Sequence, residues 1–113
     1  MALSFLKLFE PTLLVTSAAA IYNVPASPVT TLLRNGRVRL SNQATTAIGV
    51  GLYAVPASGA TSATNNFLPA VSIAPNAAIE VDVPQLAAGD AIWGYATVSS
   101  SVNIQAMDGV LQS

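Results

Sequence analysis

The feature that most constrains this chain is a period-two alternation of apolar and other residues, interrupted at intervals by proline or glycine. In the segment 37–41, Val38 and Leu40 alternate with two arginines, and Ile79–Val83 alternates three aliphatic residues with two acids. Such alternation places successive side chains on opposite faces of an extended strand. The seven prolines and seven glycines are scattered, so each alternating segment is short. The sequence therefore predicts many short strands, each with one buried face.

About eight strands are expected in the 113 residues. The other candidate strands are Thr12–Thr16, Thr16–Tyr22, Ala47–Tyr53, Phe67–Ile73, Ala91–Val98 and Val102–Ala106. No segment after residue 12 has the periodicity of an amphipathic helix. The predicted fold class is all-β: a single antiparallel, jelly-roll-like β-sandwich over residues 12–113, preceded by an apolar N-terminal arm over residues 1–11.

Turn-forming residues separate the expected strands. Asn35-Gly36 is typical of a tight hairpin turn, and Ala88–Asp90 and Asp108-Gly109 are expected to form further turns. The segment Pro56–Asn66, rich in Ala, Ser, Thr and Asn, is expected to be an exposed loop.

The composition excludes several classes of protein. The chain has no Cys and no His, so disulfides, cysteine zinc sites and Ser–His or Cys–His catalysis are impossible. Only 8% of the residues are charged, and a net charge of −1 with four basic residues argues against a nucleic-acid partner. No uninterrupted apolar run reaches the roughly 18–20 residues of a membrane-spanning helix, and Glu10-Pro11 interrupts the pattern of a cleaved signal. We expect no enzyme activity, no cofactor and no membrane partner.

Two acids are candidates for a reactive pair. Glu80 and Asp82 lie two residues apart on one strand face, so they could hold a calcium ion or a reacting water. No Asp/Asn/Gly-rich loop surrounds them, and a solvated or interface-facing strand is the simpler interpretation. No catalytic or metal-binding residue is predicted. A carbohydrate-binding or hydrolytic sandwich using Glu80, Asp82 and Trp93 is kept as an alternative.

Two arginines are predicted to bind a partner. Arg37 and Arg39 share a strand face and could grip carboxylates on another protein. They could equally pair with Glu80 and Asp82 across neighbouring strands of the same domain. Both interpretations stay open at this point.

The aromatic residues Trp93 and Tyr95 share one face of their strand, opposite Ile92 and Gly94. Such side chains fill a core or anchor an interface, and the core is the first expectation.

The N-terminal arm contains the other predicted partner-binding residues. A terminus this apolar is not expected to remain in water, so it packs on its own sandwich or on another subunit, as a short helix or an extended segment. The predicted contact residues of the arm are Leu3, Phe5, Leu6 and Phe9.

Several segments together resemble small β-sandwich proteins of tailed bacteriophages. They are Ala20–Pro25, Arg39–Gln43, Leu52–Gly59, Asn66–Pro75 and Leu86–Trp93, and the resemblance spans about residues 18–111. Members of that group serve as capsid cement (decoration) proteins, and similar modules occur in tails and fibres.

The resemblance implies a structural virion protein on the outside of a phage head, made in the host cytoplasm. Such a protein would bridge and stabilise major capsid protein subunits and would form a homodimer or homotrimer. A tail or fibre component is the alternative. The scarcity of charge agrees with this, because interface centres are depleted in Lys, Glu and Asp.

Overall fold

The structure, a computed structural model, describes residues 3–5, 7–26 and 31–112, and within these ranges every regular element is a β-strand. The strands are β1 (Leu3–Phe5), β2 (Thr12–Leu13), β3 (Ala19–Asn23), β4 (Leu32–Asn42), β5 (Ile48–Val55), β6 (Asn66–Ile73), β7 (Ala78–Val83), β8 (Leu86–Ala87), β9 (Ala91–Ala96) and β10 (Val102–Gln112). No helix in the described ranges is long and apolar enough to cross a membrane.

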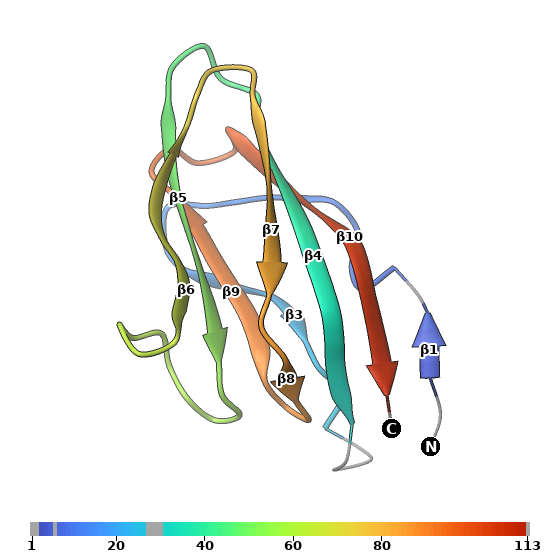
Figure 1. Cartoon of the computed structure of the whole chain (residues 1–113). Coiled ribbons are helices and arrows are strands. Elements are labelled where there is room, and N and C mark those ends of the chain that lie inside the picture. The colour runs from blue at the N-terminus through green and yellow to red at the C-terminus, as the bar shows by residue number, and fades with distance from the viewer. Residues whose placement is uncertain (1–2, 6, 27–30, 113) are drawn as a thin grey trace.

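The strands form two antiparallel sheets (Figure 1). Sheet A has the order β1-β10-β4-β7, with β2 also on β10 and β8 also on β4; sheet B has the order β3-β9-β5-β6. Along the chain, four strand pairs enclose one another, from the innermost pair β5·β6 through β4·β7 and β3·β9 to the outermost pair β2·β10. Successive pairs alternate between the sheets: β5·β6 and β3·β9 belong to sheet B, and β4·β7 and β2·β10 belong to sheet A. This nesting is the topology of a jelly roll. The predicted all-β sandwich is confirmed.

The core lies between the sheets and follows the alternation of the sequence. In β4, Val38 and Leu40 are fully buried while Arg37 and Arg39 are exposed, and β5 buries Ile48, Val50 and Leu52. The largest fully buried side chains include Leu33, Leu40, Ile48, Leu52, Ile73, Leu86, Ile92 and Ile104. Burial of one face per strand supplies most of the driving force for this fold.

The predicted hairpin turn at Asn35-Gly36 is wrong. Both residues lie inside β4, where they form a bulge. Arg37 pairs with Asp108 and Arg34 pairs with Val110, so Asn35 and Gly36 of β4 lie opposite the single residue Gly109 of β10. Asn35 has φ 55°, a left-handed conformation that asparagine tolerates in bulges as well as in tight turns. The same dipeptide therefore fits either structure, and the long pairing of β4 with β10 decides for the bulge.

The predicted turn at Asp108-Gly109 is also wrong, because both residues lie within β10. A second bulge lies at Met107 of β10, because the neighbouring residues Ala106 and Asp108 pair with the adjacent residues Val38 and Arg37 of β4. This extra residue in β10 compensates for the extra residue in β4, so the two strands return to the same register. The predicted turn at Ala88–Asp90 is confirmed, with Gly89 at φ 86°.

One buried polar side chain joins the two sheets. Asn42, at the end of β4, is 2% exposed, and its Nδ2 donates to the carbonyls of Thr46 (2.9 Å) and Ile73 (3.0 Å). Its Oδ1 accepts a bond from the Ala44 amide at 2.8 Å. Because Ile73 ends β6, this amide holds the end of a sheet A strand against sheet B.

We predict that Asn42→Ala lowers the free energy of unfolding by about 1–3 kcal/mol, because it leaves buried carbonyls without a donor. Chemical denaturation measures the effect. The exposed neighbour Gln43 provides the control: Gln43→Ala is expected to change stability by less than about 0.5 kcal/mol. Equal effects of the two substitutions would contradict the structural role of Asn42.

Candidate interaction surfaces

The described part of the N-terminal arm is extended and packs on its own sandwich. β1 pairs antiparallel with the end of β10, from Leu3–Gln112 to Phe5–Val110. Leu8 is 7% exposed and belongs to the core, where it lies over Gly109: a Cβ at Gly109 would be 2.8 Å from the Leu8 Cδ1. This close approach explains the glycine. Of the predicted contact residues in the arm, Leu6 lies outside the described residues.

Phe9, another predicted contact residue, is half-buried. It packs against the core, and its ring lies 6.2 Å from the ring of Tyr22 on β3. Burial raises the pKa of the Tyr22 phenol above its ordinary value of 10.0. Phe9 thus packs on the sandwich of its own subunit, and its contact with a partner stays a prediction.

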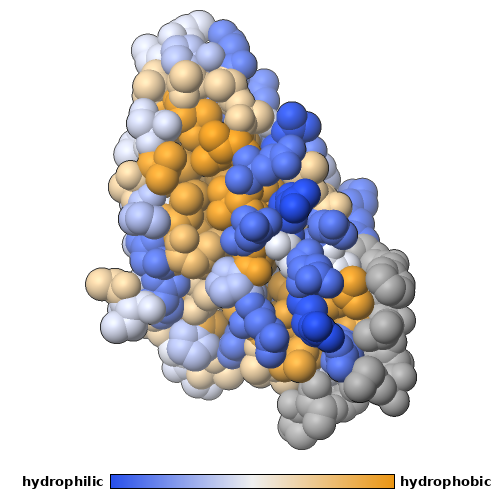
Figure 2. All heavy atoms as spheres, viewed as in Figure 1, coloured by the Kyte–Doolittle hydropathy of each residue, from blue (hydrophilic) through white to orange (hydrophobic). Residues whose placement is uncertain are grey.

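The outer face of sheet A carries most of the charge. The strands of this sheet contain six of the nine charged residues, three basic and three acidic: Arg34, Arg37, Arg39, Glu80, Asp82 and Asp108. Figure 2 shows hydrophilic residues running along β4 and β7 on this face, next to an apolar area toward β5 and β6. On these outer strands, the half-buried Phe67 of β6 and Ile79 and Val81 of β7 pack against the core.

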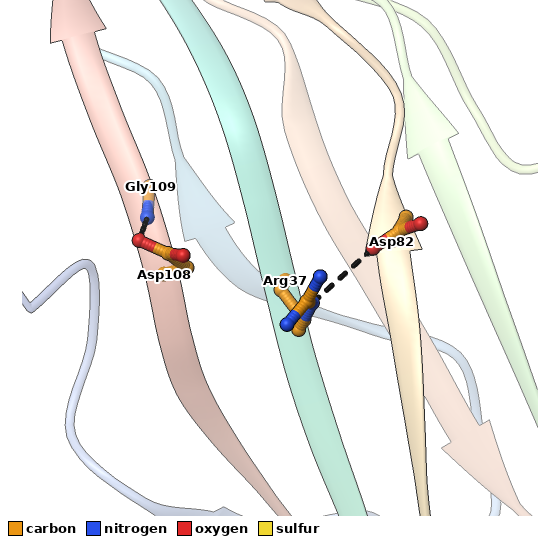
Figure 3. Close-up of polar contacts among 4 residues, drawn as sticks. All are labelled: Arg37, Asp82, Asp108 and Gly109. Carbon is orange, nitrogen blue, oxygen red and sulfur yellow. Dashed lines mark hydrogen bonds and ion pairs between the residues drawn. The ribbon is translucent and has the colours of Figure 1, made fainter.

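Arg37 lies between two carboxylates (Figure 3). Its register partners are Asp82 on β7 and Asp108 on β10. The Arg37 Nε lies 3.3 Å from the Asp82 Oδ1, whereas Asp108 accepts a bond from the Gly109 amide at 3.2 Å. A polar hollow of about 510 Å³ opens here, lined by Asn35, Gly36, Arg37, Asp82, Val83 and Asp108. Arg37 was expected either to bind a carboxylate of a partner or to pair with an acid of its own domain, and the structure shows the second arrangement.

Arg39 faces Glu80 and Gln105 in register. Within residues 3–5, 7–26 and 31–112, the ion pairs closer than 4 Å are Lys7–Glu10 and Arg37–Asp82, so Arg39 has none there. Arg39 is exposed and its guanidinium is available to a carboxylate of another molecule. Its predicted role in partner binding is untested.

The acids considered for chemistry are not assembled with the aromatic residues. Glu80 and Asp82 lie on the outer face of sheet A, and Trp93 lies on β9 of sheet B, beyond the core. The described residues contain no cluster of three or more acidic, His or Cys side chains that could hold a metal ion. The two carboxylates and Trp93 therefore cannot act together on one sugar.

The expectation that Trp93 and Tyr95 fill the core is wrong. The buried residues of β9 include Ile92, Gly94 and Ala96, so Trp93 and Tyr95 lie on the outer face of sheet B, where both are half-buried. At position 94 the inner face has no room for a side chain, because a Cβ there would lie 2.8 Å from Ile21 Cδ1 and Leu52 Cδ2. Both faces of β9 are apolar, so alternation alone does not identify the buried one.

The sequence interpretation missed Tyr53 as a member of this surface. Tyr53 is the register partner of Trp93, and its ring lies 6.2 Å from that of Tyr95. Tyr95 lies over Gly51, since a Cβ there would be 2.4 Å from its Cε1. The signal was present in β5, where Gly51 and Tyr53 alternate with buried aliphatic residues. We call Tyr53, Trp93 and Tyr95 the aromatic ridge.

Asp90 has a structural role. Its carboxylate accepts bonds from the amides of Ala57 (3.1 Å) and Ala87 (2.9 Å), which ties the loop after β5 to the turn before β9. A hollow of about 390 Å³ beside it is lined partly by Pro56, Asn66 and Phe67. The polar contacts of Asp90 are thus used within the fold.

The fold is similar to parts of two solved chains from virus particles. One belongs to the T13 particle of infectious bursal disease virus (TM-score 0.55, 8% identity), and the other to the Gx strain of that virus (TM-score 0.52, 9% identity). Each match covers 97% of this chain but only 30% and 31% of the viral chains, so this chain spans about a third of their length. No protein-family model and no curated protein matches the chain. At these identities the similarity shows a shared β-sandwich fold.

We predict that Asp82→Ala changes the free energy of unfolding by less than about 1 kcal/mol, because exposed ion pairs contribute little. The two side chains of the Arg37–Asp82 pair are 48% and 85% exposed, respectively. Urea denaturation at low and high salt measures the effect, and Lys7→Ala in the other exposed pair serves as a control. A loss well above 1 kcal/mol would show that this pair holds the sheet together.

We predict that Tyr22 weakens the fold at alkaline pH. Its pKa is raised in the folded state, so the stability that the neutral phenol contributes is fully present below about pH 10 and is lost as the pH rises through the folded pKa. In Tyr22→Phe this part of the alkaline loss is expected to be absent, as measured by denaturation between neutral pH and pH 11. Identical pH profiles of the two proteins would contradict the prediction.

Proposed function

We propose that this protein is a structural, non-catalytic component of a virion. The observation that carries the proposal is the jelly-roll sandwich, whose arrangement is shared with parts of chains in infectious bursal disease virus particles. The sequence resemblance to cement proteins of tailed bacteriophages favours the same class. The absence of His and Cys from the sequence and the separation of Glu80 from Trp93 support a role without catalysis or cofactors.

The finer proposal is a cement protein on the outside of a phage head. In this role it binds the major capsid protein, bridges neighbouring subunits, and associates with itself as a dimer or trimer. A dimer or trimer that contacts the shell through each of its subunits gains avidity, so a small interface per subunit is sufficient for stable attachment. Arg39 is the polar contact best supported by the structure, because it is exposed and has no carboxylate within ion-pair distance in the described part of its own chain.

We propose that only part of the N-terminal arm contacts the capsid. Leu8 is a core residue and Phe9 packs on Tyr22, so these two side chains stabilise their own subunit. Contact with the capsid by this segment is proposed for its first residues, Leu3, Phe5 and Leu6. Deleting residues 2–10 would remove Leu8 from the core as well, so a point substitution is the better experiment.

We predict that Arg39→Glu lowers occupancy on capsids that lack the protein by at least about tenfold, because it places a carboxylate where the guanidinium would meet acidic groups. Binding to purified capsids is measured by co-sedimentation. Gln43→Glu is the control, since it adds a carboxylate at an exposed residue outside both the strands and the N-terminal arm. Unchanged occupancy of Arg39→Glu would remove Arg39 from the interface.

A tail or fibre component is the second candidate, since similar modules occur there. The copy number per particle distinguishes the two positions: a head cement protein is present in hundreds of copies and a tail part in tens or fewer. Quantitative mass spectrometry of purified particles gives this number.

A further inference from the structure

We propose that the outer face of sheet B is the surface on which a second copy of this chain docks. The inference rests on the self-association included in the proposed function and assigns it to a specific face. The main evidence is that charged residues occur on the strands of one sheet only. The four strands of sheet B, β3, β5, β6 and β9, contain no charged residue, whereas those of sheet A contain six.

Charge favours sheet B for contact between identical copies. In a two-fold dimer the same patch supplies both halves of the interface, so each charge on that patch is taken out of water in both copies. A dimer through sheet A would desolvate six charged side chains per copy, and pairing across the interface would offset only part of this cost. The strands of sheet B contain no charged residue, so their outer face carries no such cost.

The side chains of sheet B also have the composition of an interface centre. The aromatic ridge lies on the two central strands, since β5 and β9 are paired with each other and flanked by β3 and β6. Tyrosine and tryptophan are enriched at the centres of protein interfaces, where they supply most of the binding energy. Beside the ridge on the same face lie small residues, including Ala20, Gly49 and Ser72.

The area of the face sets the expected strength of the contact. Strands about 4.8 Å apart, with about 3.3 Å per residue, give sheet B a face of roughly 19 by 17–26 Å. A standard interface takes about 800 Å² from each partner, about a seventh of the 5824 Å² surface of this chain. The face of sheet B has roughly half of that standard area, so a stable contact must also include residues that lie beside the four strands. Val15 and Val98, 41% and 48% exposed, lie beside the end of β9, where the Val15 carbonyl accepts from the Ala96 amide.

A neutral sugar is the competing occupant of an aromatic face. Sugar sites combine an aromatic platform with several convergent polar side chains. Apart from the tyrosine hydroxyls and the tryptophan indole, the polar side chains on the strands of sheet B are Asn23, Asn66 and Ser72, and none is charged. The composition of the face thus favours a protein surface.

The test uses the full chain in solution. Sedimentation equilibrium between about 1 µM and about 1 mM is expected to show a monomer–dimer equilibrium. Trp93 is the single tryptophan, so its emission is expected to shift to shorter wavelength as the dimer forms. Trp93→Lys and Tyr53→Lys each introduce a charge at the centre of the face and are expected to raise the dissociation constant at least about tenfold. Circular dichroism establishes that each variant folds, and two variants are used so that the failure of one leaves a test.

Gln43→Lys, which adds the same charge at an exposed residue outside sheet B, is the matched control and is expected to leave the equilibrium unchanged. A chain that is monomeric at every concentration would overturn the proposal, as would a dimer that Trp93→Lys and Tyr53→Lys leave intact. A shift of Trp93 emission on adding a neutral polysaccharide, without self-association, would assign the face to a sugar instead. Capsid occupancy tests the proposed function separately, since loss of self-association and loss of capsid binding are measured in different assays.

Discussion

The whole structure depends on the long strand β4. It pairs with β10 along one edge and with β7 and β8 along the other, so the central part of sheet A is assembled on it. Its inner face supplies Leu33, Val38 and Leu40 to the core, each with no exposed surface. Its end carries Asn42, which bonds to the backbone of sheet B. A single alternating segment thus fixes the register of sheet A, fills the core and connects the two sheets.

The same strand arranges the charges that give the molecule two different faces. Successive side chains of a strand point to opposite faces. Because Val38 and Leu40 of β4 point into the core, Arg37 and Arg39 point outward. The neighbouring strands place Asp82 and Asp108 on either side of Arg37, so this charged row is balanced within one subunit. Sheet B has no such row, and its outer face consists of the aromatic ridge and small residues. The two outer faces differ in chemistry although the core between them is uniform.

The sequence was sufficient for the fold class because alternation reports directly on which face is buried. It failed where one local pattern fits two structures. Asn35-Gly36 suits a tight turn and a bulge equally well, and the choice depends on β10, which is distant in the sequence. Likewise, β9 is apolar on both faces, so Trp93 could be placed only after the packing of Gly94 against Leu52 was known. The pairing of Arg37 with Asp82 was one of two open interpretations, since the register between β4 and β7 is a tertiary property.

The absence of charged residues from the strands of sheet B determines how a contact through this face depends on salt. Dissolved ions weaken attraction between charged groups at distances beyond about 10 Å at 0.1 M ionic strength, whereas burial of apolar surface is not screened in this way. A contact made through an uncharged face therefore keeps its strength in dilute and in saline water alike. A second copy docked on this face, as proposed above, would therefore stay bound when the ionic strength of the medium changes.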